Sequence, residues 1–273
     1  MSDTELFQEA VAPIGGLYRS GEGVSPEVAD HVETHFAWLA QYARVLESEA
    51  RCAFRPCFGL IANREFNAVA FRIESGTACV GINVGAIQAI DGIFCRMMAS
   101  RSIMVQIGSI EKEVEQLPLQ SPHLETLTDS MTAQTLPRCP TRRWFADAHT
   151  KQAIRFLLRH ELAHIANGHV DFLAAQHGQR FTTELDWING DASAQFDRQV
   201  IEFDADCCAA SWWCGVFLEE WFKQSGCLKP SEMADAEVDL AVKDELGMAF
   251  FQWRFPYLRC SACLATPDLR GMT

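Results

Sequence analysis

Five consecutive residues, His160-Glu161-Leu162-Ala163-His164, constrain the fold of this chain more than any other segment. In an α-helix, positions i and i+4 lie one above the other on the same face, so both histidines would point in the same direction. Two imidazoles arranged in this way can bind one tetrahedral zinc ion. Glu161 would reach a water molecule on that zinc without being a ligand, and such a water beside a carboxylate base is suited to amide hydrolysis. The segment therefore predicts a helix that carries a zinc site.

A hydrolytic zinc site needs a third protein ligand and one open position for water. A third histidine six residues after His164 would extend the motif, but Val170 stands there. His169 is one residue out of that register, so a place at the helix end or beside a zinc ligand is the better prediction for it. Glu202, in the segment EFDAD (202–206), lies far enough downstream for a second helix to pack back against the first. We predict Glu202 as the third ligand.

Asp206 follows Glu202 by about one helical turn and therefore lies on the same helix face. It could accept the free N–H of a zinc-bound histidine and hold the ring in one orientation. A glutamate and an aspartate four residues apart are also common on a solvated helix face, and this alternative stays open. The apolar run CCAASWWCGVF that follows favours a buried position, where acidic groups are rarely left unpaired.

A second pair of histidines four residues apart, His31 and His35, lies near the N-terminus. The residue after His31 is Val32, so this pair has no base at the position that Glu161 occupies in the motif. A solvated helix face is the better interpretation of this pair.

The excess of acidic residues limits the partners of this protein. Thirty-six Asp and Glu against 23 Lys and Arg give a formal net charge of −13, which argues against binding to nucleic-acid phosphates. The polar start MSDTELFQEA does not resemble a signal peptide, and no segment reaches the ~18 consecutive apolar residues of a membrane span. We therefore expect a cytoplasmic protein whose eleven cysteines are reduced thiols. For Cys260 and Cys263, two further interpretations stay open: a redox pair, or half of a structural zinc site.

Hydrophobic periodicity and turn residues predict an α+β fold that is mainly helical. Residues 66–74 and 77–84 predict a β-hairpin, and the motif helix is expected to begin near Thr150 and to stop at Gly168. The other expectations are an irregular segment at 1–22, a long loop at 116–140, and helices at 26–51, 85–105, 197–226 and 230–251. We divide the chain into an N-terminal helix and hairpin region, 1–140, and a helical zinc-binding region, 141–273, which together form one compact catalytic unit.

Taken together, HELAH, EFDAD and two shorter segments resemble the gluzincin metallopeptidases, especially the HtpX and CAAX-prenyl-protease group. The shorter segments, Asn67-Ala68-Val69-Ala70 and INVGAI (82–87), are similar to a strand and the following segment ahead of that family's active-site helix. The resemblance covers scattered motifs between residues 60 and 270. It implies a gluzincin-like core with a small antiparallel β element before the active-site helix.

The resemblance also implies roles for individual residues. Zinc would be held by His160, His164 and Glu202, with Glu161 as general base and Asp206 holding one of the histidines. The strand formed by Asn67, Ala68, Val69 and Ala70 would offer an edge for an extended substrate peptide, although an ordinary sheet strand fits these residues equally well. Thr266 stands where the family tends to have a histidine before proline, which leaves the partner of the oxyanion unassigned.

The membrane-bound members of that group carry transmembrane helices, which are not found in this sequence, so a prenylated or membrane substrate is not expected. In size and in the layout of HELAH and EFDAD, the chain also resembles the Lit-type phage-exclusion peptidases of bacteria. We therefore expect a zinc-dependent endopeptidase that acts on a cytoplasmic protein. Its activity could be constitutive or gated by a regulatory protein partner or an infection signal. The alternative is a non-catalytic interaction protein stabilised by a metal, but a purely structural site would not need Glu161 as a base.

Overall fold

The computed structural model describes residues 3–18, 26–50, 56–73, 77–114, 136–178, 181–183 and 192–225. Its helices are α1 (Asp3–Val11), α2 (Pro26–Ala50), α3 (Val84–Ala99), α5 (Pro140–Ala166), α6 (His169–His177) and α7 (Ala192–Ser225), with 3-10 turns at Ala12–Ile14 and Ile110–Lys112. Its strands are β1 (Cys57–Ile61), β2 (Ala68–Arg72), β3 (Ala78–Asn83) and β4 (Phe181–Thr183). The predicted α+β class with mainly helical structure is confirmed.

Contacts along the chain separate a first compact unit, Met1–Cys214, from a second, Gly215–Thr273. Of the second unit, the structure describes only the continuation of α7 to Ser225, so the features below all lie in the first. The predicted division at residue 140 stays a prediction. Several other predictions lie outside the described residues: most of the 116–140 loop, the 230–251 helix, and the roles of Cys260, Cys263 and Thr266. None of the described helices has both the length and the apolar character needed to cross a membrane.

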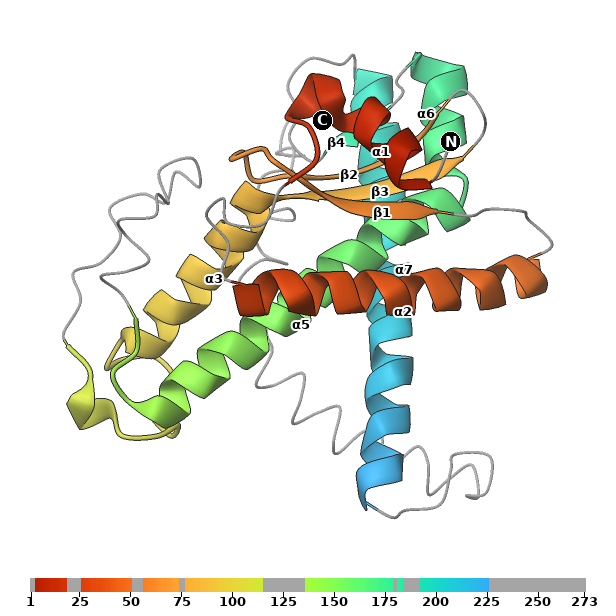
Figure 1. Cartoon of the computed structure of the whole chain (residues 1–273). Helices are drawn as coiled ribbons and strands as arrows, with labels where there is room; N and C mark the ends of the chain where they lie inside the picture. The colour runs from red at the N-terminus through yellow and green to blue at the C-terminus, as the bar shows by residue number, and fades with distance from the viewer. Residues whose placement is uncertain are drawn as a thin grey trace, which may run out of the picture. The chain divides into compact units, whose positions relative to one another are not determined.

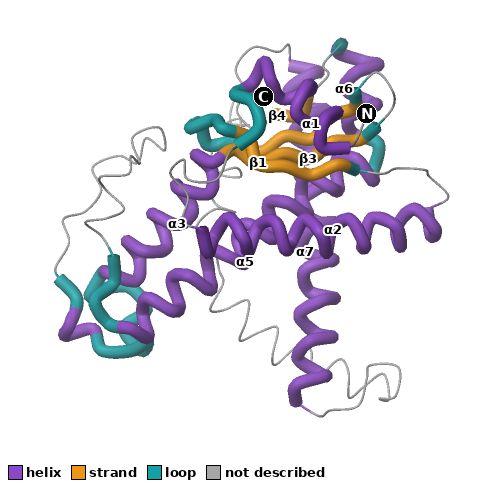
Figure 2. Tube along the Cα trace, viewed as in Figure 1, coloured by secondary structure: helices purple, strands orange, loops and turns teal. Residues whose placement is uncertain are grey.

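The strands, orange in Figure 2, form one mixed sheet. Their order in the sheet is β1-β3-β2-β4. β2 and β3 pair antiparallel, with Ala68 opposite Ile82, so the predicted hairpin pairing is confirmed. β1 pairs parallel with β3, and the sequence analysis missed both β1 and β4. The small β element is therefore mixed rather than purely antiparallel. Parallel strands such as β1 and β3 are joined by a long connection, so their pairing cannot be predicted from a short turn sequence.

Of the two interpretations left open for Asn67, Ala68, Val69 and Ala70, the structure agrees with an ordinary sheet strand and not with an exposed edge. Val69 and Ala70 pair with Thr183 and Thr182 of β4, while β3 occupies the other side of β2. The backbone of Val69 and Ala70 is therefore paired with a neighbouring strand on each side. β4 comes from a distant part of the chain, and local alternation of apolar residues cannot reveal such a pairing.

Helix α1 covers one face of the sheet (Figure 1). Residues that alternate along the strands point to this face and enclose the α1 side chains Phe7 and Val11. Phe7 is 1% exposed and Val11 is fully buried, and their spacing of four residues places them on one side of the helix. The expectation of an irregular segment at 1–22 is therefore wrong for Asp3–Val11, because these two apolar residues are enough to dock a short helix on the sheet.

Helices α2 and α5 pack on the opposite face, with α5 passing beneath β2 and β3 (Figure 1). α5 begins at Pro140 and not near the predicted Thr150. A proline suits the first helical turn, where its missing N–H would have no helical partner. The carboxylate of Glu113 accepts hydrogen bonds from the backbone N–H groups of Arg138 and Cys139, at 3.0 and 2.9 Å, and stabilises this start. Thr150 instead lies within the helix and donates to Asp91 of α3 at 3.2 Å.

The interpretation of His31 and His35 as a solvated face of α2 is wrong for His35, which is 5% exposed. Its ring stacks on Trp38 at a centroid distance of 5.3 Å, and the guanidinium of Arg159 from α5 lies over the same indole. Burial lowers the pKa of His35 to about 3, with further contributions from the positive charges of Arg159 and Arg155. The imidazole is therefore neutral in the folded protein.

Acidification is expected to destabilise the packing of α2 on α5 through His35. Because its folded pKa of about 3 lies below the ordinary value of 6.5, the unfolded chain binds a proton first as the pH falls. The stabilising contribution is complete above about pH 6.5 and is progressively lost toward about pH 3. Urea unfolding at about pH 7.5 and about pH 5 should show a larger loss of stability in wild type than in His35→Leu. Equal losses in the two proteins would contradict a buried neutral imidazole.

Candidate metal centre

Helices α5 and α7 together form the candidate site. The second half of α5 is buried, with Leu158 and Leu162 inaccessible to solvent, so the histidines between them are held in the protein interior. α5 stops where the sequence predicted, because Gly168 adopts a left-handed conformation with φ of +76° that favours glycine. On α7, the small residues Ala205 and Ala209 are fully buried.

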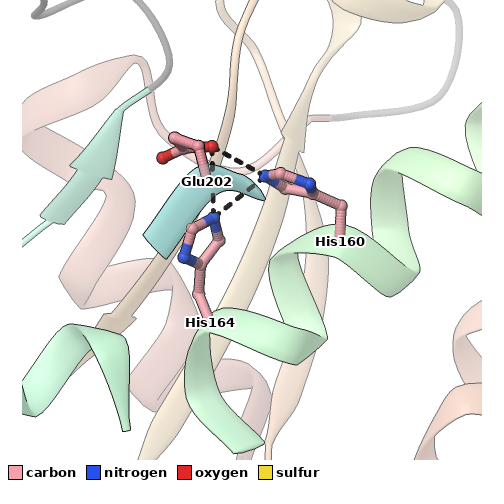
Figure 3. Close-up of side chains that lie close together, drawn as sticks. All are labelled: His160, His164 and Glu202. Atoms are coloured by element: carbon pink, nitrogen blue, oxygen red, sulfur yellow. Dashed lines mark hydrogen bonds and ion pairs between the residues drawn. The ribbon is translucent and has the colours of Figure 1, made fainter. Parts of the chain in front are cut away.

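Three ligand atoms from these two helices meet at one point (Figure 3). His160 Nε2 lies 2.9 Å from His164 Nε2 and 3.0 Å from Glu202 Oε2, and His164 Nε2 lies 3.5 Å from the same carboxylate oxygen. Bonds of about 2.0–2.1 Å to a tetrahedral zinc place its ligand atoms about 3.3 Å apart, close to these separations. Among the described residues, this cluster of His160, His164 and Glu202 could therefore hold a metal ion.

The far nitrogen of His160 is bound by Asp206, the residue predicted for this role. His160 Nδ1 lies 2.9 Å from Asp206 Oδ1. An ionised carboxylate can only accept a hydrogen bond, so Nδ1 of His160 must be the donor. In the neutral ring, Nε2 then has a free lone pair directed at the cluster.

The far nitrogen of His164 is bound in a different way. His164 Nδ1 lies 3.1 Å from Nδ1 of His169, the first residue of α6. His169 Nε2 lies 3.1 Å from Asp204 Oδ2, and the amide of Asn167 donates to that same oxygen at 2.7 Å. His169 is thus no ligand of the cluster but a neighbour of one, as the register of the motif predicted. The sequence analysis assigned no role to Asp204.

The electrostatics of the site favour a positive charge at the meeting point of the three ligand atoms. Burial alone would lower the pKa of His160, but hydrogen bonds to Asp206 and Glu202 outweigh it and raise this pKa well above its ordinary value. Burial would likewise raise the pKa of Glu202, but the hydrogen bonds with His160 and His164 prevail and lower it to about 2. Burial lowers the pKa of His164, which favours the neutral form of this imidazole. A cation at this point would satisfy all three acceptors at once.

Glu161 lies next to His160 in the sequence and is 1% exposed. The charge on its carboxylate is among the causes that raise the pKa of His160. Its carboxylate is buried and is not among the three ligand atoms of the cluster.

No protein-family model, no curated protein and no solved structure matches this chain. What the site can do therefore follows from its own geometry and chemistry.

Proposed function

We propose that this protein is a zinc-dependent endopeptidase. The observation that carries the proposal is the convergence of two imidazole nitrogens and one carboxylate oxygen, from His160, His164 and Glu202, beside the buried Glu161. Two histidines and a glutamate are the protein ligands of many zinc hydrolases, whereas structural zinc sites more often use cysteine. The donor set and the spacing of its atoms therefore fit zinc in a hydrolytic site.

Each side chain of the site has a distinct task in this proposal. Zinc held by the three ligands would act as a Lewis acid toward the peptide carbonyl and activate a water molecule. Glu161 accepts the proton of the attacking water and passes it to the nitrogen of the leaving amine. Asp206 holds the ring of His160 through its 2.9 Å contact, so that Nε2 keeps a free lone pair.

The two-helix arrangement supports a gluzincin-like core as the finer description of the fold. α5 supplies His160, Glu161 and His164, and α7 supplies Glu202 and Asp206 one turn apart. We further propose a cytoplasmic protein or peptide as substrate. We also propose that a regulatory protein partner or an infection signal, as in phage exclusion, switches the activity on. A peptidase that is always active in the cytoplasm would cleave the cell's own proteins.

Metal content of the purified protein tests the proposed site. We expect about one zinc ion per chain in wild type and severe loss in His164→Ala and Glu202→Ala, because each variant removes one of three ligands. The loss should exceed the ~10–100-fold that removal of an outer partner of a ligand costs. Plasma mass spectrometry measures the zinc content per chain, and competition against a chelator measures the zinc affinity.

His177→Ala is the matched control for this measurement. His177 is the other histidine of α6 and lies 3.2 Å from Asp197, outside the ligand cluster. It should keep the zinc content of wild type. A wild type without zinc, or Glu202→Ala with undiminished zinc, would refute the ligand set. Zinc bound in wild type without hydrolysis of any protein substrate would favour the alternative, a metal-stabilised interaction protein.

A further inference from the structure

We infer that His169 and Asp204 are positioning residues that present Nε2 of His164 to the metal. This inference rests on the proposed metal site. It concerns two residues outside the ligand set, one on α6 and one on α7. They form a hydrogen-bonded chain that runs from His164 through His169 to Asp204.

The proton positions along this chain follow from the chemistry of its last member. Asp204 is half-exposed and accepts from Asn167, so its carboxylate is an acceptor and His169 Nε2 must be the donor. With its proton on Nε2 for the contact with Asp204, the His169 ring offers Nδ1 as an acceptor. His164 Nδ1, 3.1 Å away, must donate to it. The proton of neutral His164 is therefore on Nδ1, and its Nε2 has the free lone pair that a metal requires.

The two zinc-binding histidines are thus supported in parallel but by different means. His160 Nδ1 donates directly to Asp206, whereas His164 Nδ1 reaches a carboxylate only through a second imidazole. Partners of this kind fix the tautomer and the orientation of a ligating histidine and raise its basicity. Because His164 is 1% exposed, water cannot readily replace the hydrogen bond from its Nδ1.

The local backbone explains why His169 can take this place. Gly168, with φ of +76°, separates α5 from α6 by a tight turn, so that the first residue of α6 lies beside the last turn of α5. The backbone N–H of Gly168 donates to Ile165 at 3.1 Å and closes this turn. His169 is 7% exposed and its ring lies 5.2 Å from that of His164, in an edge-on arrangement. The turn therefore places a buried imidazole behind the ligand.

Zinc affinity of the full-length chain tests the inference. His169→Phe keeps a ring but removes both nitrogens, and we expect a ~10–100-fold higher dissociation constant for zinc. His169→Asn keeps an acceptor at the position of Nδ1 and should recover most of this loss. Asp204→Asn should have a smaller effect than His169→Phe, because Asp204 is half-exposed. The absorption spectrum of bound Co²⁺ should change in His169→Phe, since it reports the orientation of the ligands.

His177→Phe is the matched control, because it makes the same change at the other end of α6. It should keep the zinc affinity and the Co²⁺ spectrum of wild type. His169→Phe with wild-type affinity and spectrum would overturn the inference while leaving the proposed function standing. Loss of affinity that His169→Asn does not reduce would also overturn it, since the lost ring and not the lost acceptor would then be the cause.

A second measurement does not depend on zinc. In metal-free protein labelled with ¹⁵N-histidine, NMR shifts of the ring nitrogens should show the proton of His164 on Nδ1 and that of His169 on Nε2. His164→Ala and His169→Phe assign the two resonances. A proton on Nε2 of His164 would overturn the inference even if wild type binds zinc. Failure of wild type to bind zinc would refute the proposed function, and the NMR experiment would still decide whether the hydrogen-bonded chain exists.

Discussion

Glu161→Gln is expected to abolish peptide hydrolysis while leaving zinc bound. Glutamine has nearly the same shape as glutamate but cannot accept a proton from water, so the variant removes the base and keeps the packing. A general base contributes ~10²–10⁴-fold to such a reaction, and we expect a loss of kcat of this size. Zinc content should stay at the wild-type value, because the ligand atoms come from His160, His164 and Glu202.

Hydrolysis can be followed as release of new amino groups from zinc-loaded protein incubated with casein and with a library of proteome-derived peptides. Glu9→Gln is the matched control, because it makes the same chemical change at an exposed position of α1, distant in sequence from the site. It should leave the rate of hydrolysis unchanged. Glu161→Gln with wild-type activity would exclude Glu161 as the base. Loss of zinc together with activity would instead indicate that Glu161 supports the ligands.

Arg142→Met is expected to destabilise the folded protein severely, by about 3–5 kcal/mol. Arg142 lies in the first turn of α5 and is fully buried. Its guanidinium donates to five backbone carbonyls at the end of α3 and in the segment that follows, those of Met98, Ser100, Ile103, Met104 and Ile107. Its charge lies 3.9 Å from the buried carboxylate of Glu113. Methionine would fill much of the space but remove the hydrogen bonds to the carbonyls and the positive charge beside this carboxylate.

The free energy of unfolding in urea, compared with that of wild type, measures this effect. Arg143→Met is the matched control, since the neighbouring Arg143 is exposed and its replacement should cost less than about 0.5 kcal/mol. Arg142→Lys should also be destabilising, because an ammonium has three donors and cannot reach five carbonyls. A stability of Arg142→Met within about 0.5 kcal/mol of wild type would show that these hydrogen bonds do not hold the segment. Since α5 also carries the two histidines, the same contacts anchor the helix that bears the site.

Features that depend on neighbours along the chain could be predicted from the sequence. HELAH specifies a helix with both imidazoles on one face, and the structure brings their Nε2 atoms to 2.9 Å. The same reasoning related Glu202 to Asp206, which lie one turn apart and contact the same histidine. The left-handed Gly168 ends α5 because glycine alone adopts that conformation without strain.

Features that join distant segments could not be predicted in this way. Thr150 has the chemistry of a helix cap, yet it lies inside α5, because Glu113 supports an earlier start at Pro140. His35 has the spacing of a solvated face, yet it is buried and stacks on Trp38, whose ring is covered by Arg159 of α5. In both cases a partner from elsewhere in the chain outweighs a weak local preference.

The composition of the candidate metal site was already specified by the order of residues, because the period of a helix is a local property that decides which side chains share a face. How that site is supported, and what surrounds it, depends on tertiary packing. The contact of His164 with His169 requires the turn at Gly168, and the contact of His169 with Asp204 requires that α7 bring Asp204 to the start of α6. The pairing of β4 with β2 likewise depends on where a distant strand docks. Such contacts arise from burial of side chains and backbone between segments far apart in the chain, and no local pattern encodes them.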